Sequence, residues 1–344
     1  MMLKQSWLFL VCGLAQAGRA TETLQPVTVA SIAGVSSQVA ELGKMQVVTI
    51  SSAQTLLPEL VDPAPQLKTF CEEIDRLYAR NKWGQSGCSQ IPFEVFAHSS
   101  QGRPLVLFRG EKAKVVRSPT KLTIVQCGIH GDELPSVPMC FRLINEILSG
   151  KRGIKKGQQL IVQPLLNPDG MFANKPTRNN ARGVDINRNF PTKNWKADAV
   201  KSWEKKDRKD PRKFPGETAN SEPETQAIVE FIAREKPQKI ISVHTPLGFL
   251  DLDAPNKNKD QERRAKFLAI NIVKNSGNYQ FRTFGVYPGS LGNYSGRERN
   301  IPVYTLELPG GVSPSTIDNY WSRFRAGFWR AIDFDLDTGQ FVED

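Results

Sequence analysis

The chain contains three histidines, at positions 98, 130 and 244, so any imidazole chemistry must use these side chains. His130 closely follows the apolar run 122–127, and His244 directly follows the run 239–243. Both runs are typical of buried strands. Functional side chains of α/β sheets gather just beyond the carboxyl ends of strands, so we expect these two imidazoles to face one crevice. His98, in the sequence Ala-His-Ser-Ser, is interpreted as structural.

Glu133 follows His130 at a three-residue spacing and adds a carboxylate to the two imidazoles. Catalytic zinc sites use nitrogen and carboxylate ligands, with three from the protein and one open position. His130, Glu133 and His244 supply that set and predict one bound Zn²⁺, with Gly131 allowing the tight turn. Asp132 either orients His130 or faces solvent. The His-x-x-Glu spacing alone is weak evidence, because most strand-end histidines are hydrogen-bonded core residues.

Further motifs accompany these three residues in a fixed order. They are Gly102-Arg103-Pro104, Asn167-Pro-Asp-Gly170, Thr177-Arg178, the stretch Gly183-Val-Asp-Ile-Asn-Arg-Asn-Phe-Pro191, Ser221-Glu-Pro-Glu224 and Thr305-Leu-Glu307. In this order the chain resembles the zinc metallocarboxypeptidase family over roughly residues 95–330. His244-Thr-Pro-Leu247 and the segment 287–294 are similar to the bacterial murein peptide amidase branch, which cuts the γ-D-glutamyl–diaminopimelate bond of cell-wall peptides.

The resemblance implies the catalytic groups. Glu307, at the end of a strand, would take a proton from the attacking water and pass it to the leaving amine. Arg178 would polarise the scissile carbonyl and stabilise the oxyanion. Arg182 lies close by in the sequence and is the competing candidate for that role, although the spacing to Asn187 and Arg188 favours Arg178.

The resemblance also implies a substrate-binding set. Asn187 and Arg188 match the pair that grips a terminal carboxylate, for which arginine offers a planar bidentate fork. Tyr287 is the candidate for the tyrosine that precedes the catalytic glutamate, in a loop that is short here, and Tyr294 is expected to be a packing aromatic. The segment 291–293, where we expect the specificity pocket, contains no acidic residue.

Alternating strands and helices must position these side chains. The expected strands are 104–109, 122–127, 159–165, 239–243 and 303–308, and the expected helices are 134–148, 224–234 and 263–276. This alternation predicts an α/β fold with a mostly parallel sheet. The resemblance to the metallocarboxypeptidases implies that the sheet is mixed and has helices on both faces. A helical period over 67–78 precedes them. We expect a catalytic domain over 91–335, a C-terminal tail over 336–344 and a small N-terminal region of unknown role over 21–90.

Residues 1–20 have the pattern of a signal peptide. Lys4 precedes a short apolar run over 7–14, and Ala15-Gln-Ala17 is typical of a cleavage site. A buried N-terminal strand is the alternative. This pattern predicts an exported protein, periplasmic or secreted, and no other apolar segment is long enough to cross a membrane.

Four cysteines lie beyond this segment, and export would permit disulfides between them. Cys71 and Cys88 are the favoured pair because they are close in the sequence and Cys88 lies in a polar turn. Cys127 and Cys140, which flank the expected metal site, are interpreted as buried thiols.

The composition is that of a compact globular protein, with 39% apolar and 24% charged residues and a net charge of +11. A basic chain favours polyanionic surroundings, but no nucleic-acid-binding motif is found. The basic segment 193–213 is expected to be a solvated surface loop.

Three functions remain open from the sequence. The first is a cell-wall amidase acting on peptidoglycan-derived peptides, the second a carboxypeptidase acting on L-peptides, and the third an inert wall-binding protein on the same fold. The complete ligand set and Glu307 argue against the third. The oligomeric state is not predicted.

Overall fold

The computed structural model describes residues 63–110, 121–253 and 258–343. The predicted signal peptide and residues 21–62 of the predicted N-terminal region lie outside the described residues, so these predictions stay untested. The described residues form one compact unit.

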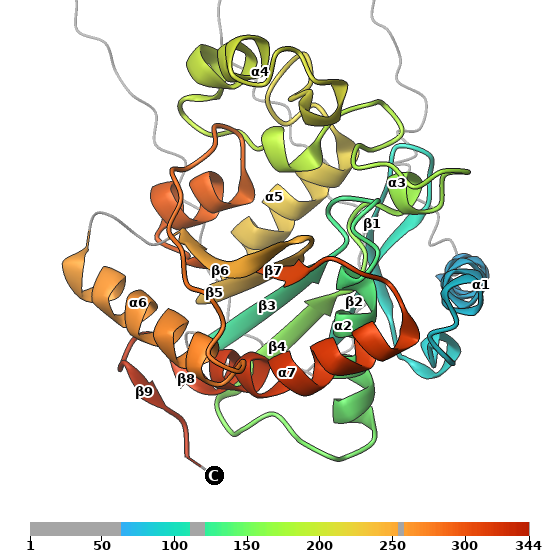
Figure 1. Cartoon of the computed structure of the whole chain (residues 1–344), viewed down its shortest axis with the longest axis vertical. Helices are drawn as coiled ribbons and strands as arrows, with labels where there is room; N and C mark the ends of the chain where they lie inside the picture. Colours follow the sequence, from blue (N-terminus) through green and yellow to red (C-terminus); the bar gives the residue numbers. More distant parts are fainter. Residues whose placement is uncertain (1–62, 111–120, 254–257, 344) are drawn as a thin grey trace, which may run out of the picture. The chain divides into compact units, whose positions relative to one another are not determined.

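A seven-stranded mixed sheet forms the centre of this unit, in the order β1-β2-β4-β3-β5-β7-β6 (Figure 1). The strands are β1 (Glu94–His98), β2 (Pro104–Arg109), β3 (Lys121–Cys127), β4 (Gln158–Gln163), β5 (Lys239–His244), β6 (Leu247–Asp253) and β7 (Val303–Pro309). The four central strands run parallel, whereas β1, β2 and β6 are antiparallel to their neighbours. The predicted fold class is confirmed.

Helices cover both faces of the sheet because its central strands are buried on both sides. They are α1 (Pro63–Asn81), α2 (Ser136–Leu148), α3 (Pro168–Met171), α4 (Val200–Lys205), α5 (Pro223–Glu235), α6 (Lys259–Lys274) and α7 (Pro314–Asp333). Successive residues of β3 pack in two different hydrophobic clusters. Val125 belongs to the cluster that includes residues of α2, α6 and α7, and Ile124 belongs to the cluster that includes residues of α5. No helix among the described residues is long and apolar enough to cross a membrane.

The described part of the region before residue 91 packs into the same core as the residues that follow it. Phe70 of α1 is fully buried and meets Phe93 edge to face, with ring centroids 5.9 Å apart. The predicted disulfide between Cys71 and Cys88 is confirmed and ties α1 to the following turn. Residues 63–90 therefore pack on the catalytic domain as part of the same compact unit.

The interpretation of Cys127 and Cys140 as thiols is wrong, because the structure joins them in a second disulfide. Cys127 ends β3 and Cys140 lies in α2, which packs on that strand, so their Cα atoms are 6.4 Å apart. Both residues are buried, as expected. The bridge fastens α2 to the strand that leads to His130.

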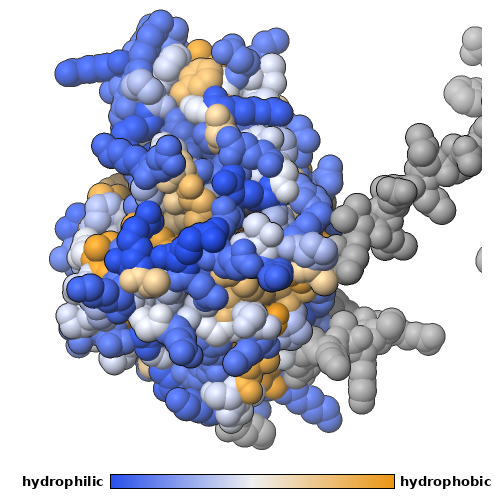
Figure 2. All heavy atoms as spheres, turned by 90° about the vertical axis from the view of Figure 1, so that its right-hand side faces the viewer, coloured by the Kyte–Doolittle hydropathy of each residue, from blue (hydrophilic) through white to orange (hydrophobic). Residues whose placement is uncertain are grey.

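The segment 193–213 is not the loop predicted. It contains a π-helical turn (Trp195–Ala199), α4 and a 3-10 turn (Pro211–Lys213). Trp195 is buried and donates its indole N–H to the carbonyl oxygen of Arg188 at 2.8 Å, and the ring of Trp203 packs at a tilt against that of Phe214. These aromatic contacts anchor a segment whose remaining surface is basic. On the face shown in Figure 2, hydrophilic residues predominate and hydrophobic ones form small groups.

Candidate active site

A cavity of about 900 Å³ opens at the carboxyl ends of the central strands. Residues from several predicted motifs line it together. All eight predicted site residues are among the lining residues: His130, Glu133, Arg178, Asn187, Arg188, His244, Tyr287 and Glu307. The fold therefore brings together side chains that are up to 177 positions apart in the sequence.

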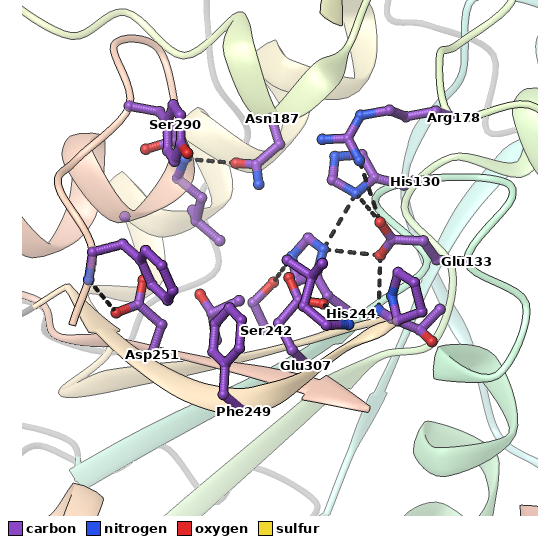
Figure 3. A pocket seen from close by; sticks show the side chains of 18 of the residues that line it. His130, Glu133, Arg178, Asn187, Ser242, His244, Phe249, Asp251, Ser290 and Glu307 are labelled. Atoms are coloured by element: carbon purple, nitrogen blue, oxygen red, sulfur yellow. Dashed lines mark hydrogen bonds and ion pairs between the residues drawn. The ribbon is translucent and has the colours of Figure 1, made fainter. Parts of the chain in front are cut away.

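The three predicted metal ligands converge at one end of this cavity (Figure 3). The Nδ1 atoms of His130 and His244 are 3.2 Å apart, and they lie 2.7 and 3.0 Å from the two carboxylate oxygens of Glu133. All three residues are buried, and their ligand atoms lie within 4.8 Å of one another. Two facing imidazole nitrogens and a carboxylate form a donor set that fits a zinc ion.

The outer nitrogens of both imidazoles have polar partners of their own. His130 Nε2 lies 3.2 Å from the carboxylate of Asp185, and His244 Nε2 lies 3.0 Å from the hydroxyl of Ser242. Such partners fix the ring orientation and leave the inner nitrogen free to ligate metal. Burial raises the pKa of Glu133, but the two imidazoles outweigh it and hold that pKa below its ordinary value. The carboxylate is therefore ionised, as a ligand must be.

Asp132 does not orient His130. Its carboxylate instead forms a 2.6 Å ion pair with Arg212, and Asp185 takes the orienting position. Asp185 lies at the start of the 3-10 turn Ile186–Arg188, and its side chain accepts the backbone N–H of Asn187. This functional residue was missed in the sequence, although it stands inside the quoted 183–191 motif.

We expect Asp185→Asn to weaken zinc binding by about 10- to 100-fold, the usual cost of losing a partner that orients a ligand histidine. Competition with a zinc chelator would measure the affinity. Asp132→Asn is the matched control, and it should leave zinc affinity unchanged. Equal zinc affinity in the two variants would contradict the assignment.

Glu307 lies near the end of β7, directly opposite Phe249 of the antiparallel strand β6. Its carboxylate accepts the backbone N–H of Leu247 at 3.4 Å, and its carbonyl oxygen accepts the hydroxyl of Tyr279 at 2.6 Å. Burial raises the pKa of Glu307 above its ordinary value, which favours proton uptake by this carboxylate. Figure 3 shows Glu307 close to the metal ligand His244, which is its register partner on the neighbouring strand β5.

Arg178 rather than Arg182 lines the cavity, and Arg182 is exposed. The Arg178 guanidinium is held at 2.9 Å by Asp185 and at 3.3 Å by Glu133. These two carboxylates hold a positive charge beside the metal ligands, where an oxyanion would develop. The choice of Arg178 is thus supported by position.

Asn187, Arg188 and Tyr287 lie together on another wall. The side-chain oxygen of Asn187 accepts the backbone N–H of Leu291 at 2.9 Å, which turns its amide nitrogen away from that bond. The Arg188 guanidinium stacks 4.5 Å over the ring of Tyr287, which is half exposed. Burial lowers the pKa of Arg188, because a buried cation lacks its hydration. An anionic group of a substrate would meet this arginine favourably.

Tyr294 and His98 were both predicted to have structural roles. Tyr294 is buried and packs on Phe190 with ring centroids 5.5 Å apart, which confirms it as a packing aromatic. His98 does not line the cavity, and its Nε2 atom lies 2.8 Å from the side-chain oxygen of Gln66, as expected for a structural residue.

Two acidic residues of the cavity wall were missed in the sequence. Asp251 and Asp253 lie on β6 and line the cavity beside Leu291 and Gly292. The sequence prediction of the specificity pocket considered only the segment 291–293, which contains no acidic residue. Here the acidic side chains come from a strand that lies 40 residues earlier, which only the fold brings close.

The buried ligands and strand-end glutamate define a metallohydrolase of the carboxypeptidase type. The chain belongs to the zinc carboxypeptidase family, whose model matches residues 86–327. It is 30% identical to murein peptide amidase A of Escherichia coli K12 over 229 residues, covering 66% of this chain and 85% of that protein. The protein of the same name from Vibrio campbellii is 28% identical, covering 67% and 85%.

Solved structures show the same fold. The carboxypeptidase A of Helicoverpa armigera superposes with a TM-score of 0.57 at 16% identity, covering 77% of this chain and 72% of that one. Family membership and the ligand set together identify the chain as a zinc peptidase or amidase.

Proposed function

We propose that this enzyme hydrolyses the γ-D-glutamyl–diaminopimelate amide bond of peptidoglycan peptides, using one zinc ion. The observation that carries the proposal is the position of Asn187 and Arg188 in the same cavity as the metal ligands and Glu307. A carboxylate grip there suits a leaving residue with a free carboxylate next to the cut bond. The relatives named murein peptide amidase support the choice of this bond.

A bound zinc ion would polarise the scissile carbonyl and lower the pKa of a bound water to about 7. The protein's own groups then divide the work. Arg188 and Asn187 hold the carboxylate of the leaving residue, and Arg178 donates to the oxyanion as charge develops on the carbonyl oxygen. Glu307 accepts the proton of the attacking water and delivers it to the departing amine.

The carboxylate grip predicts a specific loss in an Arg188→Gln variant. We expect its KM for a substrate with a free carboxylate to rise by at least about tenfold, because a charge-assisted hydrogen bond is lost. A substrate carrying a methyl amide in place of that carboxylate should be poor for both proteins and lose little further in the variant. If the variant lost the same factor on both substrates, Arg188 would not bind the carboxylate.

The substrate assignment is tested with the tripeptide L-Ala-γ-D-Glu-meso-diaminopimelate and mass spectrometry of the products. We expect release of free diaminopimelate that stops when zinc is chelated. α-linked L-peptides with varied C-terminal residues serve as the comparison. Cleavage of the L-peptides alone would make the protein an ordinary carboxypeptidase, and cleavage of neither would favour a binding protein.

We also propose that the protein is exported. The pattern of residues 1–20 supports this, and so do the two disulfides among the described residues, since disulfides persist mainly in oxidising compartments. N-terminal sequencing of the protein recovered outside the cytoplasm tests the proposal. A mature chain that begins near residue 18 is expected, and an intact Met1 would contradict it.

A further inference from the structure

Two of the three metal ligands lie inside a loop that a disulfide closes. Cys127 ends β3, Cys140 lies in α2, and their sulfur atoms are joined across a sequence separation of 13. His130 and Glu133 lie between these two cysteines. The covalent ring therefore contains the whole His-x-x-Glu motif, and in Figure 3 both side chains of the motif point toward His244.

The cysteine at the strand end is also close to the third ligand in the sheet. Cys127 is the register partner of Val243 on the parallel strand β5, and His244 follows Val243 directly. The carbonyl oxygen of Cys127 accepts the backbone N–H of Leu166 at 3.2 Å. Cys127 thus has fixed neighbours in the sheet, and the disulfide connects this fixed point to α2, which begins shortly after Glu133.

Inside the ring, one small side chain connects the strand end to the helix start. Ser136 Oγ accepts the backbone N–H of Gly128 at 3.2 Å and donates to the carbonyl oxygen of Glu133 at 2.7 Å. Hydrogen bonds of this kind contribute a modest net free energy, because water can replace either partner. The disulfide is not exchanged with water, so it holds the helix start beside the strand end more firmly than these bonds do.

The other disulfide offers a comparison within the same chain. Cys71 and Cys88 are both buried and close a ring of similar size, with a sequence separation of 17. This second ring contains no metal ligand and no residue that lines the cavity. Ring size governs how strongly a cross-link restricts the unfolded chain, so the two bridges should restrict it to a similar extent. A difference between them in metal binding would therefore report their position.

We propose that the disulfide between Cys127 and Cys140 positions His130 and Glu133, so that the site binds zinc tightly only after this pair has been oxidised. The two thiols pass two protons and two electrons to a disulfide oxidant, which becomes two thiols as the new S–S bond forms. A chain with reduced thiols holds zinc weakly, so activity follows export. The proposal rests on the proposed export for the oxidising compartment.

The physical reason is the order of the ligand turn before the metal arrives. Metal affinity falls in proportion to the fraction of metal-free protein whose ligands already have the binding geometry. With the ring open, the turn between β3 and α2 samples more conformations, and zinc binding must order it at a cost in entropy. We expect zinc affinity to fall by at least about tenfold, the lower end of the effect of losing a group that orients a ligand.

Two double variants test the proposal. Cys127→Ala with Cys140→Ala removes the bridge at the site, and Cys71→Ala with Cys88→Ala is the matched control. We expect the first to bind zinc at least about tenfold more weakly and to release it faster to a chelator, and the control to keep wild-type values. The melting temperature of the metal-free protein should fall in both. Zinc affinity is measured well below the lower of these temperatures, so that every protein compared is folded.

A second measurement serves if the site variant does not fold. The control variant keeps Cys127 and Cys140, and it is refolded with and without a phosphine reductant, while alkylation and mass spectrometry report the state of the pair. The oxidised form should bind zinc at least about tenfold more tightly than the reduced form. Zinc affinity is measured without substrate, so this result does not depend on which bond the enzyme cuts.

Equal zinc affinity with and without the bridge at the site would overturn the proposal, and so would an equal loss of affinity in both double variants. A reduced protein that stays unfolded in saturating zinc would also contradict it, because the bridge would then serve the fold rather than the metal site.

Discussion

Replacing Glu307 with glutamine should lower kcat by about 10²- to 10⁴-fold, the usual contribution of a general acid–base group. Glutamine keeps the size of the side chain but cannot take up a proton. The residue lies opposite Phe249 on the cavity wall and is not one of the three metal ligands. Zinc content should therefore stay at the wild-type level, and KM should change little.

The control is Glu217→Gln, an exposed glutamate that does not line the cavity. Steady-state kinetics on the same substrate, with zinc measured in each preparation, separate the two variants. If Glu307→Gln kept most of its kcat, or if its activity fell only as far as its zinc content, Glu307 would not be the catalytic base.

His244→Ala should abolish both zinc binding and activity. This buried imidazole is one of three protein ligands, so its loss should weaken zinc affinity by more than the roughly 10- to 100-fold expected for an orienting partner. Because a ligand that binds only the folded state raises its stability, chelation should lower the melting temperature of the wild-type protein. The variant should melt at one temperature with and without chelator.

His98→Ala is the matched control, since His98 is the one histidine outside the ligand set. It should keep its zinc and its response to chelation. A His244→Ala variant that still bound zinc at wild-type affinity, or still melted lower after chelation, would place the metal elsewhere.

The sequence was most informative where a signal is local. The strands 104–109, 122–127 and 303–308 were predicted within one residue, because continuous apolar runs of that length identify buried strands. Helix α6 begins at Lys259, four residues before the expected start, because Asn258 caps its first turn with its side chain. Helix α7 was not predicted, although Tyr320, Phe324 and Phe328 repeat at helical spacing.

Strand β6 was missed for a physical reason. Its sequence Leu-Gly-Phe-Leu-Asp-Leu-Asp places Leu250 and Leu252 in the core and the two aspartates on the opposite face, which lines the cavity. The strand therefore lacks the continuous apolar run that identified the central strands. The aspartates that interrupt the apolar pattern are also the residues that line the cavity, and departures of this kind are expected at functional sites.

Contacts between separate segments of the chain could not be predicted from the sequence. The partner of His130 is Asp185 rather than the neighbouring Asp132, and Cys127 pairs with Cys140 through the packing of α2 on β3. Both depend on how the chain closes on itself. The resemblance of the ordered motifs supplied what local patterns could not, since it assigned candidate roles to Arg178 and Glu307, which the fold then brought into one cavity.

The central claim is that one zinc ion, held by His130, Glu133 and His244, drives amide hydrolysis in this cavity. The most direct test adds zinc in measured equivalents to metal-free protein while the cleavage rate of the γ-D-glutamyl tripeptide is followed. Activity should rise linearly and reach its plateau at one zinc per chain. Full activity in the metal-free protein, or a plateau at two equivalents, would contradict the claim.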